Sequence, residues 1–188
     1  MRAIALTVLI CSGLTAASQI VFDEGKAPTK QRSPELEALN FMTGKWNSEF
    51  TLRETPELKE FKGKGIGVTQ WSPNGQFLIT DGWTLMPPPP GFTPKAWFNK
   101  LSVTTWDPIK KEYRITEVMA GFTYTEVMTM DRKGGTIQNE TRNGDHVTKT
   151  TITFERVSDT EMKFHTECSI DDGPKWVYFE GTTRKVSD

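Results

Sequence analysis

The stretch Phe41-Met42-Thr43-Gly44-Lys45-Trp46 lies where the residue periodicity of the chain changes. Before it, Ser33 and Pro34 form an N-cap and first-turn pattern, and a short apolar stripe follows, so we expect one short helix that ends near Gly44. After Trp46, apolar and polar residues alternate with a period of two, which is typical of β-strands. The stretch is therefore predicted to join an N-terminal helix to an all-β domain.

Nearly all of the remaining chain is predicted to form antiparallel strands separated by turn signals such as Pro73-Asn74-Gly75 and Arg142-Asn143-Gly144-Asp145. The expected strands are residues 46–52, 61–71, 76–84, 96–106, 113–119, 122–130, 136–140, 147–157, 162–170 and 176–186. About ten strands at regular spacing predict one closed, antiparallel, up-and-down β-barrel over residues 34–186. Three glycines on one phase of the second strand are expected to let the barrel wall bend: Gly63, Gly65 and Gly67.

The first 18 residues have the pattern of a secretory signal peptide. Arg2 is followed by an apolar run over residues 3–10 and by small residues at 16–18, which predicts cleavage near Ser18/Gln19. A membrane anchor is the alternative, but the apolar run is shorter than the ~20 residues that span a bilayer. We therefore expect a secreted or periplasmic protein, with a flexible leader over residues 19–33.

Charge and cysteine content narrow the possible partners. Removal of the signal takes Arg2 away and moves the formal net charge from −1 to −2, so no basic excess favours nucleic acid. Cys11 leaves with the signal, and Cys168 alone cannot form a disulfide within the chain. We expect Cys168 to be a small buried hydrophobe. After the signal, no apolar run is long enough to cross a membrane.

The segment Pro87-Pro88-Pro89-Pro90 interrupts the strand pattern. Proline has no N–H to donate to a strand ladder, so we expect an extended, fairly stiff surface loop here. Two interpretations remain open for this loop, a plain connector and a lid over one mouth of the barrel.

The sequence contains no pattern that predicts a metal, a cofactor or a catalytic nucleophile. His146 lies beside a turn and His165 lies on the polar phase of its strand, so neither is expected to line the interior. No Cys/His cluster has zinc spacing, and no serine lies in a Gly-x-Ser-x-Gly elbow.

Each of three apolar strand phases contains a glutamate. These phases are Tyr113-Ile115-Glu117-Met119, Phe122-Tyr124-Glu126-Met128 and Trp176-Tyr178-Glu180-Thr182-Arg184. If all three face inward, three acids line the barrel and need partners or a wet cavity. The simpler interpretations are a polar, hydrated interior or a bulge that resets the phase of one strand.

We predict that one cavity is lined by Trp83, Tyr113, Glu117, Tyr124, Glu126 and Tyr178. Such a cavity would favour a small, neutral or cationic, partly apolar molecule. Three functions remain open: a binding protein, an enzyme that uses a buried glutamate as general acid or base, and a filled structural barrel without a ligand. Two carboxylates without a cationic partner would favour the enzyme, whereas a carboxylate paired with arginine would favour binding or structure.

The Gly44-Lys45-Trp46 pattern, after a short helix and at the first strand, resembles the first signature of the lipocalin and wider calycin barrels. The resemblance implies that Trp46 lies at the closed end with an arginine of the last strand, here Arg184, across its ring. Three stretches are similar to one uncharacterised lipocalin-like family of bacterial exported proteins, domain-of-unknown-function family fifteen seventy-nine: residues 41–46, 74–78 and 105–113. That family has no established activity, so the resemblance implies a fold and leaves the function open.

Overall fold

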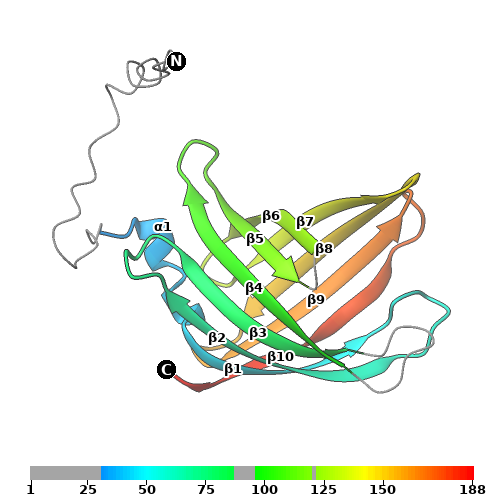
Figure 1. The fold of residues 1–188 in the computed structure, drawn as a ribbon, viewed down its shortest axis with the longest axis horizontal. Coiled ribbons are helices and arrows are strands. Elements are labelled where there is room, and N and C mark those ends of the chain that lie inside the picture. Colours follow the sequence, from blue (N-terminus) through cyan, green and yellow to red (C-terminus); the bar gives the residue numbers. More distant parts are fainter. Residues whose placement is uncertain (1–30, 87–95, 120–121) are drawn as a thin grey trace, which may run out of the picture.

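Ten antiparallel strands close into a single barrel, which confirms the predicted all-β fold (Figure 1). The computed structural model describes residues 31–86, 96–119 and 122–188. Each strand pairs with its neighbours in the chain, and the first pairs with the last, so the topology is up-and-down. The predicted signal peptide, most of the predicted leader and the polyproline loop lie outside the described residues.

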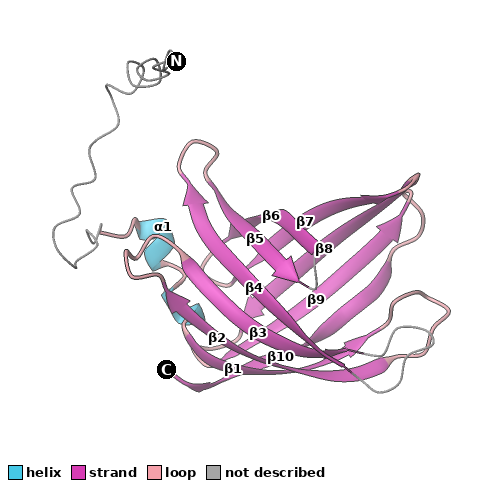
Figure 2. Cartoon of the chain, viewed as in Figure 1, coloured by secondary structure: helices cyan, strands magenta, loops and turns pink. Residues whose placement is uncertain are grey.

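The strands, which Figure 2 shows in magenta, follow the predicted ranges closely. They are β1 (Gly44–Leu52), β2 (Phe61–Trp71), β3 (Leu78–Met86), β4 (Ala96–Asp107), β5 (Glu112–Met119), β6 (Phe122–Met130), β7 (Gly134–Asn143), β8 (His146–Arg156), β9 (Glu161–Ile170) and β10 (Trp176–Ser187). The largest difference is β7, which is longer than expected. Its polar residues pair along their whole length with β8, so pairing overrides their low strand propensity.

The helical segment is shorter than predicted and consists of two pieces, α1 (Pro34–Glu37) and the 3₁₀ turn η1 (Asn40–Met42). Ser33 caps α1 as expected, because its side-chain oxygen accepts a hydrogen bond from the Leu36 N–H at 3.3 Å. Gly44 does not end the helix but opens β1 with φ +116°. A Cβ at this position would lie 2.6 Å from the Ser187 carbonyl oxygen, so glycine is required there.

The helical segment plugs one end of the barrel (Figure 1). Leu36 and Leu39 are buried in a cluster with four side chains from β3, β5 and β6: Leu78, Tyr113, Ile115 and Met128. The Tyr113 hydroxyl donates to the Glu35 carbonyl oxygen at 2.8 Å, and the Trp46 indole N–H donates to the Met42 carbonyl oxygen at 2.7 Å. This end is therefore a packed, hydrogen-bonded floor, which we call the closed end.

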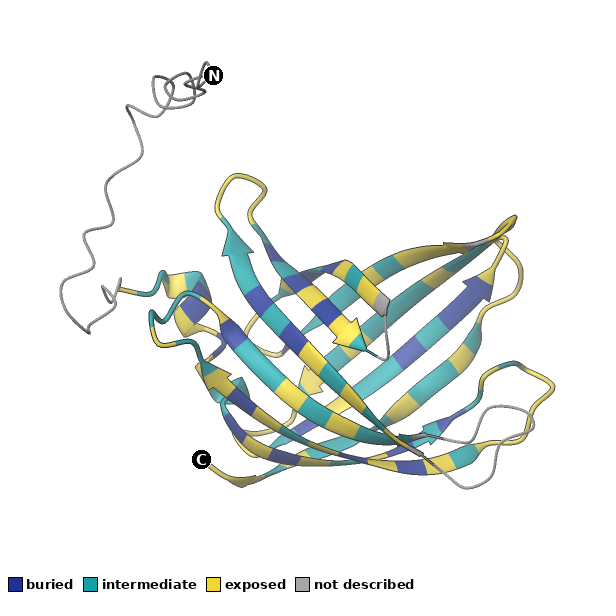
Figure 3. Ribbon diagram, in the orientation of Figure 1, coloured by how far each residue is buried: buried dark blue, intermediate teal, exposed yellow. Residues whose placement is uncertain are grey.

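Burial alternates along the strands, as Figure 3 shows. On three strands, however, apolar side chains lie on the outer face of the barrel, where polar side chains are usual. The outer face of β2–β4 carries exposed apolar side chains, namely Ile66, Val68, Trp83, Trp97 and Leu101. The inner face of β2 carries the three glycines. A Cβ on Gly63 would lie 2.3 Å from the Phe50 ring, so this glycine admits a large side chain from β1 into the interior.

Candidate functional site

An ion pair with a buried carboxylate lies on the inner wall toward the end of the barrel opposite the helix. Lys100 on β4 donates to Glu117 Oε1 at 2.7 Å, and the hydroxyl of Tyr124 on β6 donates to Glu117 Oε2 at 2.5 Å. Tyr124 is paired directly with Glu117 in the register of β5 and β6, which places both side chains on the same face. Both carboxylate oxygens are therefore occupied, which suits a charged glutamate that is only 6% exposed.

Glu126 lies one step deeper on β6 and is 5% exposed. The Asn139 side-chain N–H donates to Glu126 Oε1 at 3.1 Å. Burial, reinforced by the negative charge of Glu117, raises the pKa of Glu126, while the Asn139 hydrogen bond and the charge of Lys100 act in the opposite direction. Burial and the hydrogen bond to Glu117 raise the pKa of Tyr124, which keeps its phenol protonated.

Tyr178 lies on the same phase of β10 as Trp176, whose pairing partner Cys168 is buried, and it stands at a β-bulge. The register of β10 against β9 shifts between Val177 and Phe179, so Tyr178 and Phe179 both leave the regular alternation. Burial raises the pKa of Tyr178, and Tyr178 in turn contributes to the raised pKa of Tyr124. The two phenols therefore face the same space.

Because of the bulge, the predicted inward phase of β10 does not continue beyond Tyr178. Beyond it, Glu180 and Arg184 point outward and are exposed. Arg184 forms an ion pair with Glu161 at 2.9 Å, so the predicted contact between Arg184 and Trp46 is wrong. The cation over the Trp46 ring is Lys185, whose Nζ lies 5.3 Å from the ring centroid and which pairs with Trp46 across the strands.

Two other predicted lining residues lie elsewhere. Trp83 is 45% exposed and belongs to the outward phase of β3, although it is among the residues that border the internal cavity described below. Tyr113 faces inward, but its ring packs on Trp106 and its hydroxyl is used by the closed end. The structure therefore brings Glu117, Tyr124 and Glu126 together on β5 and β6, with Tyr178 near enough to raise the pKa of Tyr124, and separates Trp83 and Tyr113 from them.

A cavity of about 270 Å³ lies inside the barrel beside the ion pair. The aromatic residues that line it are Trp46, Phe50, Trp83, Phe164 and Phe179, and the glycines are Gly65, Gly67 and Gly82. Lys100 is the one charged side chain that lines it among the described residues. Lys100 was not predicted from the sequence. The alternate phase of β4, with Trp97, Leu101 and Val103, is more apolar and therefore looks like the inward one.

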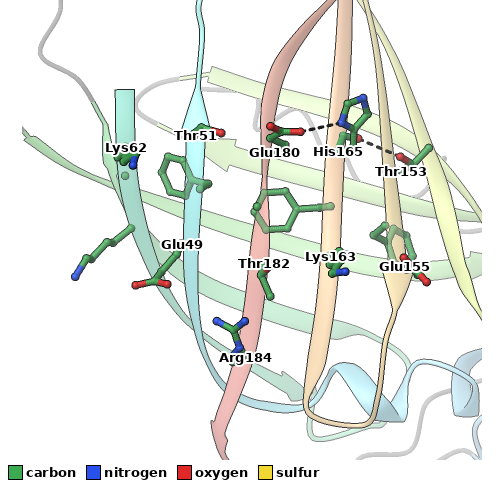
Figure 4. A pocket seen from close by; sticks show the side chains of 16 residues that line it. Glu49, Thr51, Lys62, Thr153, Glu155, Lys163, His165, Glu180, Thr182 and Arg184 are labelled. Atoms are coloured by element: carbon green, nitrogen blue, oxygen red, sulfur yellow. Dashed lines mark hydrogen bonds and ion pairs between the residues drawn. The ribbon is translucent and has the colours of Figure 1, made fainter. Parts of the chain in front are cut away.

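A larger groove of about 900 Å³ lies on the outside of the barrel, across β2, β1, β10, β9 and β8 (Figure 4). Charged side chains of opposite sign face one another across its strands. Lys64 is opposite Glu49, and Lys163 is opposite Glu155. His165, outward as expected, lies 3.4 Å from Glu180. We interpret this groove as a charge-balanced, solvated wall and place the candidate site inside the barrel.

Other chemistry has little support in the described part of the chain. Its His, Cys, Asp and Glu residues contain no group of three or more that could hold a metal ion. Cys168 is buried as predicted, and burial raises the pKa of its thiol. None of the helices in the described ranges is long and apolar enough to cross a bilayer.

Comparisons with known proteins support the barrel and nothing more specific. No protein-family model matches the chain, and a search of curated proteins finds no match. Among solved structures, the barrel is similar to that of Rv2717c from M. tuberculosis, with a TM-score of 0.54 and 10% sequence identity. The match covers 82% of this chain and 99% of that chain. Identity this low shows a shared fold alone.

Proposed function

We propose that this protein is an exported binding protein that holds a small, partly apolar molecule inside its barrel. The observation that carries the proposal is the internal cavity, which combines aromatic walls with the Lys100–Glu117 pair at its edge. Mostly apolar walls with a few placed polar groups are the usual composition of a ligand site. The signal-peptide pattern of residues 1–18 and the resemblance to exported lipocalin-like barrels support the export.

The size of the cavity limits the ligand. About 270 Å³ corresponds to roughly nine water molecules at ~30 Å³ each and lies just below the usual range for drug-sized ligands. Phe179 stacks on Phe164 with ring centroids 5.0 Å apart and contacts Phe50 at 4.4 Å. These rings form a preorganised apolar surface. A ligand about the size of a single substituted ring fits these limits.

The charge of the site favours a neutral or cationic ligand over an anion. The one ammonium at the cavity is already neutralised by Glu117, so an anion would have to compete with a buried carboxylate for it. An ammonium carries three N–H donors, so Lys100 can still donate to a carbonyl or hydroxyl oxygen of a ligand.

The two alternative functions fit the geometry less well. An enzyme was expected to show two carboxylates without a cationic partner, but Glu117 has both oxygens committed to Lys100 and Tyr124. The cationic partner of Glu117 is a lysine and not an arginine, but it pairs with the carboxylate in the way expected of a binding or structural role. A barrel filled by its own side chains would need larger residues at Gly67 and Gly82, which are opposite each other and leave the wall open to the cavity.

Native mass spectrometry of protein purified from its own host tests the proposal. We expect a bound small molecule that is lost on denaturation. NMR titration with 2-phenylethanol, a neutral probe of suitable size, should shift the resonances of Phe164, Phe179 and Gly67. A chain without a bound molecule, together with no shift at millimolar probe, would contradict a ligand-binding interior.

A further inference from the structure

Glu126 is a buried carboxyl group that is only half satisfied. Oε1 accepts the hydrogen bond from Asn139, whereas Oε2 has no hydrogen-bond partner among the residues that the structure describes. Among the described residues, the one fully buried side-chain atom that lacks a hydrogen bond is Glu112 Oε1, which instead forms an ion pair with Arg114 at 2.6 Å. Glu126 Oε2 therefore keeps some access to the barrel interior. Glu126 does not itself line the 270 Å³ cavity, but it lies on the same inner wall as the Lys100–Glu117 pair at the edge of that cavity.

The groups around Glu126 cannot neutralise its charge. On β5, Glu117 adds a second negative charge, and on β4 the Lys100 ammonium is bonded to Glu117. Across the interior, β9 and β10 contribute Cys168 and Tyr178, which are uncharged at neutral pH. The inward residues of β7 and β8 at this height, Asn139 and Thr150, do not titrate, and Tyr124 on β6 itself stays protonated.

Charge balance follows from these contacts. With Glu117 ionised against Lys100, this part of the wall is neutral as long as Glu126 carries a proton. If Glu126 ionises, one negative charge is left in a region where both glutamates are about 95% buried. Such a charge needs a partner, and the described residues offer none beyond Lys100, so the partner must come from a ligand.

We propose that Glu126 anchors the ammonium group of a ligand amine, which competes with a proton for the same buried carboxylate. This inference rests on the proposed ligand-binding function and names the ligand class as small, aromatic or apolar amines. The protonated amine enters from water, its N–H groups donate to Glu126 Oε2, and one proton leaves Glu126 for solvent. The phenols of Tyr124 and Tyr178 face the same space and offer aromatic surface for a cation.

The exchange predicts a direction for the pH dependence of binding. Proton and ammonium compete for one carboxylate, so amine affinity should fall as the pH falls through the raised pKa of Glu126 in the empty barrel. The limiting slope is about tenfold per pH unit. A neutral ligand of the same shape should bind without this dependence.

Isothermal titration calorimetry with two matched probes tests the proposal. The probes are 2-phenylethylamine, which is cationic at neutral pH, and 2-phenylethanol, which is neutral. Titrations in phosphate and in Tris, whose ionisation enthalpies differ, count the protons released. We expect the amine to release up to about one proton and the alcohol to release none. Glu126→Gln should abolish the release and reduce the preference for amine over alcohol at least tenfold, whereas outward-facing Glu180→Gln should change neither.

The outcomes separate this inference from the proposed function. If the alcohol binds but the amine binds no better and releases no proton, the ammonium anchor is wrong and the binding cavity stands. The same holds if Glu126→Gln keeps the wild-type preference and proton release while its thermal melting shows a folded barrel. If neither probe binds at millimolar concentration, both proposals are wrong.

Discussion

The Lys185 ammonium lies over the indole of Trp46, 5.3 Å from the ring centroid, at the closed end of the barrel. Both side chains are largely enclosed, with Trp46 7% exposed and the Lys185 side chain 12% exposed. The next residue along the chain in either direction faces the opposite side of the sheet, so Arg184 lies outside. Among the last-strand cations, Lys185 is therefore the one that covers the tryptophan.

This arrangement predicts an order of stability effects at the closed end. Trp46→Ala removes a buried ring and should lower the free energy of unfolding by about 3–5 kcal/mol. Lys185→Met keeps the alkyl packing and removes the charge, so it should cost about 0.5–2 kcal/mol. Arg184→Ala breaks only an exposed pair and should cost less than about 1 kcal/mol. Urea unfolding of the three variants gives the order, and a larger effect of Arg184→Ala than of Lys185→Met would contradict it.

The helical plug should be necessary for barrel stability. Leu39 is fully buried between the strands, so Leu39→Ala should lower the free energy of unfolding by about 2–5 kcal/mol. Leu58→Ala is the matched control, because the side chain of Leu58 is 50% exposed in a loop and should change stability by less than about 0.5 kcal/mol. Equal urea midpoints for the two variants would show that the helix only rests on the barrel.

The strand number and closure of this fold can be predicted from sequence because turns carry local signals. Asn-Gly and Pro-Asn-Gly segments mark the strand ends, and ten strands of suitable length are enough to close a barrel. On β5 and β6 the apolar phase also identified the inward face, which is why Glu117, Tyr124 and Glu126 were expected side by side. Neither inference required knowledge of contacts between residues far apart in the sequence.

The orientation of the other strands depends on long-range packing that the sequence pattern does not show. On β3, Trp83 belongs to the more apolar phase but faces outward, because the phase that faces the interior is that of Thr80, Gly82 and Thr84. On β10 the bulge at Tyr178 reverses the phase, so Glu180 leaves the interior. Lys100 became recognisable only when β4 and β5 were paired, since its partner Glu117 is 17 residues away.

The Lys100–Glu117 pair should respond asymmetrically to loss of either partner. Glu117 has a side chain that is 8% exposed, whereas that of Lys100 is 39% exposed. Lys100→Met leaves a buried carboxylate without its cation and should cost about 3 kcal/mol, the low end for a broken buried pair. Glu117→Gln leaves a lysine that water partly solvates, so it should cost less, about 1–2 kcal/mol. Chemical unfolding at neutral pH measures both, and a larger cost for Glu117→Gln would contradict the assigned burial.

The raised pKa of Glu126 predicts how stability changes with pH. The folded protein binds the Glu126 proton more tightly than the unfolded chain, where the ordinary pKa is 4.5, so this residue favours the folded state at low pH. Its contribution is lost as the pH rises from about 4.5 through the raised pKa.

Glu126→Gln lacks this titration and serves as the reference. The stability of the wild type relative to Glu126→Gln should therefore decline as the pH rises from about 4.5 through the raised pKa, by at most ~1.4 kcal/mol per pH unit. Urea unfolding at several pH values measures the difference. Glu180→Gln, at an exposed position, is the control, and its free energy of unfolding should change with pH in the same way as that of the wild type. A difference that is flat or rises with pH would show that Glu126 is ionised in the folded barrel.

Two glycines on the same face of β2 provide a direct test of the cavity. A Cβ on Gly67 would meet its nearest neighbour, the Asp81 carbonyl oxygen, at 3.5 Å, an ordinary contact, and Gly67 lacks the positive φ that only glycine adopts easily. Gly67→Val should therefore be tolerated and should raise stability by about 0.5–1 kcal/mol, because glycine is a poor strand residue. Its methyl groups would occupy the cavity, so binding of 2-phenylethanol should be lost.

Gly63→Ala, four residues away on the same face of β2, is the control that should destabilise the barrel. Its Cβ would lie 2.3 Å from the Phe50 ring and 2.8 Å from the Leu85 carbonyl oxygen, so the core must shift at a cost of about 1–3 kcal/mol. Thermal melting and probe titration of both variants separate stability from binding. A Gly67→Val barrel that is at least as stable as the wild type but no longer binds the probe would place the ligand in this cavity. Unchanged binding in Gly67→Val would place it elsewhere, because a filled cavity cannot hold a ring.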